Sequence, residues 1–180
     1  MAAVGRKGSK LLRPVALIGF MGAGKSLVGR GLADALGARF EDLDDRVASE
    51  QQRSIVELFA MGEAAFRTAE MAALRRLMRE RPGIWALGGG TPCTAEARTV
   101  LIQAGCLVVW LQADWPVLQD RVTGDGRPLW TKGPAAARRL WEARRGAYEA
   151  AAHWVVDGAP PAAIVATSLA ERLREEGYVG

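Results

Sequence analysis

Cysteine and histidine are scarce in this chain of 180 residues, which contains two cysteines and one histidine. Cys93 and Cys106 are too few for the disulfide framework that stabilises small secreted domains. We interpret Cys93 as a small packing residue rather than a nucleophile. His153 has no cluster of metal ligands around it in the sequence, so we interpret it as a packing or strand-edge residue.

Long hydrophobic runs are also missing, and none approaches the roughly 18 residues needed to cross a bilayer. The first fourteen residues contain bases but no acid, and no apolar region long enough for a secretory signal follows them. We therefore expect a cytoplasmic protein with no membrane partner. We expect residues 1–13 to form a flexible basic arm, whose use in nucleic-acid binding or organelle targeting stays open, and residues 14–180 to form a single domain. The bases of the arm are Arg6, Lys7, Lys10 and Arg13.

Charge of one sign does not accumulate, although the net charge is +4. Basic residues are scattered among twenty acids, without a basic stripe or an aromatic platform. This pattern argues against a nucleic-acid partner. We assign the excess to the arm, to solvated helix faces and to the surroundings of small anionic ligands.

The most informative segment that is present is residues 19–26, which read GFMGAGKS and fit the pattern G-x-x-x-x-G-K-[ST]. An apolar stretch at 15–18 precedes the segment, and apolar residues at helical spacing follow it over 27–36. Glycines allow successive backbone amides to converge on phosphate oxygens at the N-terminus of a helix. We expect Lys25 to reach the β- and γ-phosphates and Ser26 to bind Mg²⁺. A glycine-rich turn without a ligand is the alternative, which the strand and helix on either side disfavour.

Apolar and amphipathic segments alternate along the rest of the chain, without an internal repeat. This alternation predicts an α/β fold in which helices cover both faces of a parallel sheet, with ligands at the carboxyl ends of the strands. Residues 124–134, rich in Gly and Pro, are expected to form a mobile loop. We expect strands at 15–18, 39–44, 83–87, 106–111 and 154–156, and helices at 27–36, 45–50, 54–60, 63–80, 94–103, 135–152 and 162–175, with one more starting near Trp115.

Several short motifs occur together with the glycine loop, and as a set the chain resembles the shikimate kinase family over about residues 15–176. The resemblance implies a three-layer α/β/α kinase fold of the nucleoside-monophosphate-kinase type. It implies a five-stranded parallel sheet of order 2-3-1-4-5 and a mobile lid at about 122–134. It also implies a monomer that uses ATP and Mg²⁺ to phosphorylate the 3-hydroxyl of shikimate in chorismate and aromatic amino-acid biosynthesis. The motifs are the glycine loop, Asp42-x-Asp44, Phe66-Arg67 (with Glu70 three residues on), Gly88-Gly89-Gly90, Arg127-Pro128-Leu129, and Arg144 before Tyr148.

On the nucleotide side, the resemblance implies that Asp42 lies near Mg²⁺ together with Ser26, and that Arg121 lies along the adenine. Arg127, in the expected lid, would bring a cation onto the transferring phosphoryl group. The chain departs from relatives in the loop at 157–161, which lacks the basic residue that often touches the base. The implied nucleotide-binding residues are Gly22, Ala23, Gly24, Lys25, Ser26, Leu27, Arg121 and Arg127.

On the acceptor side, Arg67 and Arg144 are implied to clamp the shikimate carboxylate, since a guanidinium donates two parallel hydrogen bonds. The glycines Gly88, Gly89 and Gly90 are implied to line the pocket. Asp42 and Asp44 lie two apart at a strand end, so an extended backbone would aim both carboxylates the same way.

Asp44 is implied to accept hydrogen bonds from substrate hydroxyls, and whether it also takes the proton stays open. A helix N-cap is its alternative role. Phe59 and Phe66 are equally open between a wall of the pocket and the core. The implied catalytic residues are Lys25, Asp44 and Arg127.

Two other functions remain possible from the sequence. A related small-molecule kinase, such as a gluconate kinase, would share the glycine loop but would not require both arginines together with the triple glycine. A non-catalytic binding module of the same fold would typically have lost the loop lysine, an acid of the pair or a clamp arginine. This chain keeps all of them.

Overall fold

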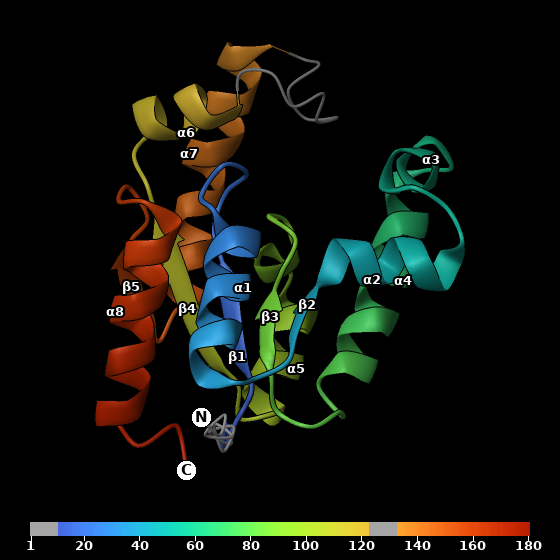
Figure 1. The fold of residues 1–180 in the computed structure, drawn as a ribbon. Coiled ribbons are helices and arrows are strands. Elements are labelled where there is room, and N and C mark those ends of the chain that lie inside the picture. The colour runs from blue at the N-terminus through green and yellow to red at the C-terminus, as the bar shows by residue number, and fades with distance from the viewer. Residues whose placement is uncertain (1–10, 123–132) are drawn as a thin grey trace, which may run out of the picture.

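A computed structural model describes residues 11–122 and 133–180 of the chain. Its centre is a five-stranded sheet of order β2-β3-β1-β4-β5 in which every pair of neighbours is parallel (Figure 1). The predicted fold class and strand order are therefore confirmed. The strands are β1 (Val15–Ile18), β2 (Phe40–Asp42), β3 (Ile84–Ala86), β4 (Leu107–Gln112) and β5 (Trp154–Asp157).

The central strands are apolar because helices cover them on both sides. Val15 of β1 lies level with Ile84 of β3 and Leu107 of β4, and all four residues of β1 are buried. A strand buried on both faces needs such a continuous apolar run. The edge strand β5 instead alternates partly buried and exposed residues.

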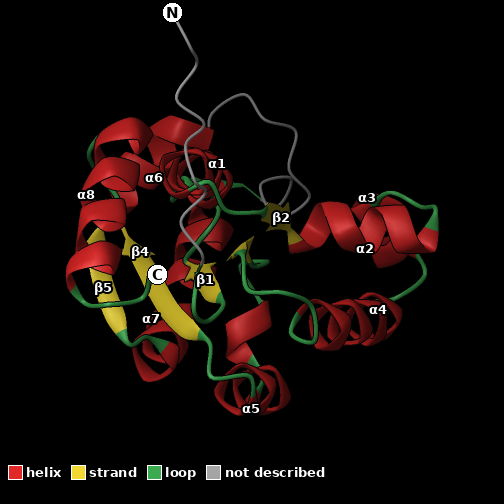
Figure 2. Cartoon of the chain, turned by 60° about the horizontal axis from the view of Figure 1, so that its bottom comes forward, coloured by secondary structure: helices red, strands yellow, loops and turns green. Residues whose placement is uncertain are grey.

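Two layers of helices enclose the sheet, and a third group extends past its β2 edge. Helices α1 and α8 pack together on one face, whereas α5 and α7 lie on the other (Figure 2). Helices α2, α3 and α4 project beyond β2 (Figure 1). The helices are α1 (Lys25–Leu36), α2 (Leu43–Gln51), α3 (Ile55–Ala60), α4 (Glu63–Leu77), α5 (Ala95–Gln103), α6 (Trp115–Val122), α7 (Pro134–Ala151) and α8 (Ala162–Glu175), with a 3-10 turn η1 (Thr91–Cys93).

Local sequence signals explain most helix ends. Ser54 and Glu57 form a capping box at the start of α3, and Thr94 caps α5 through its side chain. Helix α1 ends at Gly37, whose φ of 62° is in the left-handed region that favours glycine. Helix α4 ends at Leu77, earlier than the expected Glu80.

Near the N-terminus, Leu11 forms an antiparallel bridge with Val179, and Leu12 N–H donates to Tyr178 O at 3.0 Å. Residues 1–10 of the expected basic arm and 123–132 of the expected lid lie outside the described residues. Among the helices described, none combines the length and the apolar character needed to cross a membrane.

Candidate active site

The glycine loop connects β1 to α1 at the carboxyl end of the sheet. Gly22 and Gly24 have φ values of 81° and 89°, which an L side chain rarely adopts. A Cβ on Gly22 would also lie 2.6 Å from Val122 Cγ2. Lys25 folds back over the loop and donates from Nζ to Gly19 O at 2.9 Å and Phe20 O at 3.2 Å.

Asp42, the last residue of β2, meets the start of α1. Ser26 Oγ donates to Asp42 Oδ2 at 2.5 Å, so the two residues expected near Mg²⁺ lie in contact. Asp42 Oδ1 accepts from Asp44 N–H at 3.1 Å and caps α2. The expectation of one extended backbone through both acids is wrong, because the chain turns into a helix at Leu43. Asp42 is the N-cap, and Asp44 lies in the first helical turn.

Asp44 is mostly buried, and its Oδ1 has no hydrogen-bond partner among the described residues. Burial, followed by the negative charges of Asp42 and Glu70, raises the pKa of Asp44 to about 6, while Lys25 acts in the opposite direction. A carboxyl group with a free oxygen and a pKa this close to neutrality is suited to accept a hydrogen bond or a proton from a hydroxyl group.

The triple glycine at 88–90 follows β3, and both acidic and basic side chains approach it closely. A Cβ on Gly88 would come within 2.9 Å of Asp44 Oδ1 and of Glu70 Oε1, and a Cβ on Gly90 within 2.4 Å of Arg67 Nη2. The absence of side chains therefore permits these charged groups to approach the backbone of the loop.

The two predicted clamp arginines reach this loop from α4 and α7. Arg67 Nη1 donates to Glu70 Oε2 at 2.7 Å. Arg144 Nη1 would lie 3.5 Å from a Cβ on Gly89, and its guanidinium lies over the ring of Phe20. The next arginine, Arg145, lies over Trp141 instead. The fold thus brings Arg67 and Arg144, which are distant in sequence, to the same three glycines.

Arg121 of α6, which was expected to lie along the adenine, binds the loop at 157–161, a loop without a basic residue of its own. Its Nη1 donates to Gly158 O and its Nη2 to Ala159 O, both at 2.7 Å. A cation from α6 therefore lies at the loop between β5 and α8. Leu27 is exposed at the start of α1, and Arg127 lies outside the described residues.

Three features of the site were not predicted from the sequence. Glu70 is 1% exposed and holds Arg67, although the motif Phe66-Arg67-x-x-Glu70 was a signal for it. Tyr148 Oη donates to Gly89 O at 2.7 Å, and burial raises the pKa of Tyr148. Thr91 Oγ1 donates to Glu70 Oε1 at 2.6 Å, a contact that no sequence pattern indicated.

The stacking of Phe59 on Phe66, with ring centroids 4.4 Å apart, belongs to the packing between α3 and α4. Phe66 is buried in the hydrophobic core, and Phe59 is partly buried and packs against that core. This packing favours the core interpretation of Phe66.

The parallel sheet, the glycine loop before α1 and the lysine folded over it define a nucleotide-binding protein of the P-loop class. The profile of the shikimate kinase family, described as "Shikimate kinase", matches residues 21–174. The chain therefore belongs to the shikimate kinase family.

Relatives and solved structures agree with this assignment. The chain is 41% identical over 168 residues to shikimate kinase of Caulobacter vibrioides, covering 91% of this chain and 83% of that one. It is 41% identical over 163 residues to shikimate kinase of Streptomyces coelicolor, covering 86% of this chain and 92% of that one. The structure of Acinetobacter baumannii shikimate kinase in complex with shikimate superposes with a TM-score of 0.87 at 31% identity, covering 93% of this chain and 96% of that one.

Proposed function

We propose that this protein is a shikimate kinase that transfers the γ-phosphoryl group of ATP to the 3-hydroxyl of shikimate, within chorismate and aromatic amino-acid biosynthesis. Membership of the family implies ATP as the donor. The observation that carries the proposal is the meeting of Asp44, Arg67 and Arg144 at the triple glycine, next to the phosphate loop. An acid and two guanidiniums around a glycine pocket suit a small hydroxylated carboxylate.

The nucleotide side would bind the triphosphate mainly through backbone amides. Gly22, Ala23, Gly24 and Ser26 would present N–H groups at the positive end of α1, with Leu27 beside them. Lys25, now bonded to loop carbonyls, would turn its ammonium group toward the β- and γ-phosphates and stabilise charge in the transition state.

Magnesium fits the oxygen donors of Ser26 and Asp42. The hydroxyl and the carboxylate are in contact at 2.5 Å, and Mg²⁺ typically combines one or two such ligands with phosphate oxygens and water. Mg²⁺ would neutralise phosphate charge, while Asp42 continues to cap α2 through its other oxygen.

The acceptor side would orient the shikimate ring. Arg67 and Arg144 would bind its carboxylate, and Gly88, Gly89 and Gly90 would allow its hydroxyls to approach the backbone. Asp44 would accept a hydrogen bond from the attacking hydroxyl through Oδ1 and could take its proton. Positioning and charge neutralisation account for most of the catalysis of phosphoryl transfer.

Two more arginines complete the proposed nucleotide site. Arg127 belongs to the expected lid and would approach the transferring phosphoryl group when the lid closes. Arg121 would shape the adenine side through its bonds to the loop after β5. We also propose that residues 14–180 form one catalytic domain, and that the enzyme acts as a cytoplasmic monomer.

The competing function is that of another small-molecule kinase. A kinase of that kind would not require both arginines together with the triple glycine, whereas here Arg67 and Arg144 both lie near these glycines.

The direct test is ADP release with shikimate, quinate and gluconate as competing acceptors. We expect shikimate to be strongly preferred and Lys25→Met to lower turnover by at least about a hundredfold.

Arg144→Ala should weaken shikimate binding strongly while the KM for ATP stays unchanged. Arg145→Ala is the matched control and should behave like the wild type. Equal turnover of gluconate and shikimate, or equal effects of the two arginine variants, would contradict the proposal.

A further inference from the structure

Thr91 follows the triple glycine and is fully buried. It begins the turn η1, in which its N–H donates to Gly88 O at 3.1 Å. Its hydroxyl donates to Glu70 Oε1 at 2.6 Å. Thr91 therefore connects the glycine loop to α4 by a single side-chain hydrogen bond.

Glu70 receives a different donor on each oxygen. Oε1 accepts from Thr91, and Oε2 accepts from Arg67 Nη1 at 2.7 Å. Because the carboxyl group is almost completely removed from water, each of these bonds replaces hydration that Glu70 has lost. The two bonds together fix the rotation of the carboxylate plane.

Arg67 depends on that carboxylate for its position. Its other carboxylate contact, from Nη2 to Glu63 Oε1, is 3.4 Å long and involves an exposed acid. The short bond to Glu70 is therefore the one that orients the guanidinium. Nη2 lies on the side of Gly90, toward the proposed acceptor pocket.

We propose that Thr91 is a positioning residue for acceptor binding: its hydroxyl fixes Glu70, which aims Arg67 at the carboxylate of the acceptor. This inference rests on the proposed function. It also links the glycine loop to the arginine of α4, because two hydrogen bonds, one on each oxygen of Glu70, connect Thr91 to Arg67. A packing role alone would require only the size and shape of Thr91, and not its hydroxyl.

The test separates the hydroxyl group from the shape of the side chain. Thr91→Val keeps the shape and removes the donor, whereas Thr91→Ser keeps the donor and removes a methyl group. We expect Thr91→Val to raise the Kd and KM for shikimate by about ten- to thirtyfold, since it removes a hydrogen bond to a buried charge. The KM for ATP should change by less than about twofold, and Thr91→Ser should restore most of the shikimate affinity.

A double-mutant cycle identifies the route of the effect. In an Arg67→Ala background, Thr91→Val should weaken shikimate binding by less than about twofold further, because its effect acts through Arg67. Thr99→Val on α5, where the hydroxyl donates to Ala95 O on the surface, is the matched control and should have no effect on either substrate. If Thr91→Val does not fold, Thr91→Ala replaces it in the same cycle.

The outcomes distinguish this inference from the function on which it rests. An active wild type with normal shikimate affinity in Thr91→Val would overturn the role of Thr91 alone. Loss of affinity in Thr91→Ser as well, or full additivity with Arg67→Ala, would also overturn it by pointing to packing. A wild type that never phosphorylates shikimate would overturn the proposed function, and this inference with it.

Discussion

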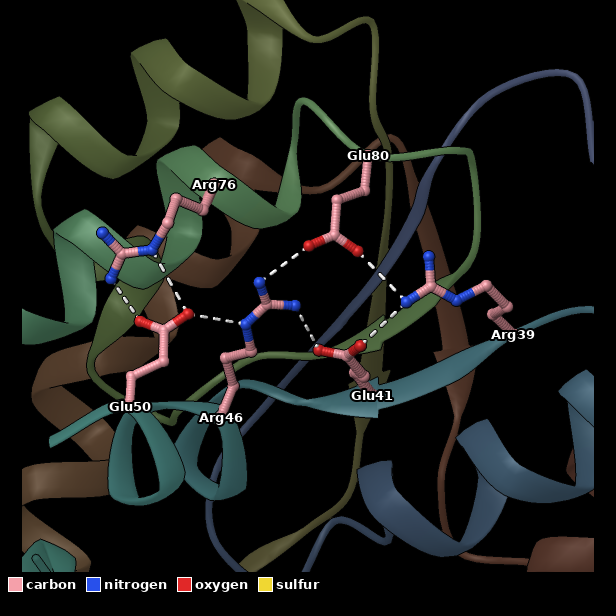
Figure 3. Close-up of polar contacts among 6 residues, drawn as sticks. All are labelled: Arg39, Glu41, Arg46, Glu50, Arg76 and Glu80. Carbon is pink, nitrogen blue, oxygen red and sulfur yellow. Dashed lines mark hydrogen bonds and ion pairs between the residues drawn. The ribbon is translucent and has the colours of Figure 1, made fainter. Parts of the chain in front are cut away.

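Two clusters of paired arginine and glutamate differ in their surroundings, since one lies in the interior and the other at the surface. The interior cluster contains Arg67, Glu70, Thr91 and the nearby Asp44 at the carboxyl ends of the strands. The surface cluster joins β2, α2 and α4 (Figure 3). The functional groups are the same, but their exposure to water differs. The surface cluster consists of Arg39, Glu41, Arg46, Glu50, Arg76 and Glu80.

Arg46 is the centre of the surface cluster. It pairs with Glu80 at 2.7 Å, and with Glu41 and Glu50 at 2.8 Å each, which raises its pKa above the usual range. Arg39 and Arg76 close the two ends of the cluster (Figure 3). Each carboxylate therefore contacts two guanidiniums, and water still reaches all of the groups.

The strand β2 separates the two clusters. Successive side chains of a strand point to opposite faces, so Glu41 lies with Arg46 while Asp42 lies with Ser26. The surface cluster can therefore connect α2 to the sheet without entering the site. Exposed ion pairs typically contribute up to about 1 kcal/mol each, whereas breaking a buried pair costs about 3–5 kcal/mol because a charge is left unpaired.

The largest loss of stability is expected when Arg67 is removed from its buried pair with Glu70. Arg67→Ala should lower the free energy of unfolding by about 3 kcal/mol, because Glu70 is left as a buried charge with Thr91 as its remaining partner among the bonds described. Adding Glu70→Gln should recover part of this stability, since it removes the buried charge, but it should not restore shikimate binding. Urea unfolding and binding calorimetry measure the two quantities. A double variant no more stable than Arg67→Ala would contradict this account of the buried charge.

The protonation of Asp44 is expected to have a smaller effect on stability, and this effect depends on pH. Its pKa rises from 3.8 in the unfolded chain to about 6 in the folded protein, mainly through burial. Between these values the folded state holds a proton that the unfolded chain has released, so the free energy of unfolding falls as pH rises through this window. Above pH 6 the full cost of the buried charge is present.

Asp44→Asn should therefore be more stable than the wild type at pH 8 by about 2 kcal/mol, and this advantage should disappear near pH 4. Urea unfolding across this range measures the difference. Asp45→Asn, on the exposed neighbour in the same helical turn, is the control and should not reproduce the gain. A constant difference between Asp44→Asn and the wild type at all pH values would be inconsistent with titration of Asp44.

How far these features could be predicted depends on whether they are local in sequence. The phosphate loop is contiguous, and its neighbours Val15–Ile18 and the apolar face of α1 fixed its context, so it was found from the residues alone. The start of α2 was not predicted correctly, because a pair of acids is compatible with both the end of a strand and the cap of a helix. Only the backbone turn at Leu43 decides between them.

The proposed acceptor side was harder to predict from the sequence, because its residues come from distant segments. Arg67 and Arg144 were predicted only through the resemblance, since an arginine on a helix is usually at the surface. The contact of Thr91 with Glu70 and those of Arg121 with the loop after β5 depend on how helices approach loops across the sheet. No spacing rule within a single chain encodes such contacts.

The smallest loss of stability is expected when Arg46, at the centre of the surface cluster, is replaced. Arg46→Met keeps an aliphatic stem over β2 and removes three ion pairs of a side chain that is 20% exposed. The free energy of unfolding should fall by about 1 kcal/mol in low salt and by less in 1 M salt, where surface charges are screened. Steady-state constants for both substrates should stay within about twofold of the wild type, because Glu41 and Asp42 face opposite ways.

Arg138→Met, which removes one exposed pair with Glu142 on α7, is the control and should be nearly neutral. A loss of shikimate affinity in Arg46→Met comparable to that of Arg67→Ala would mean that the surface cluster also orients the acids of the site.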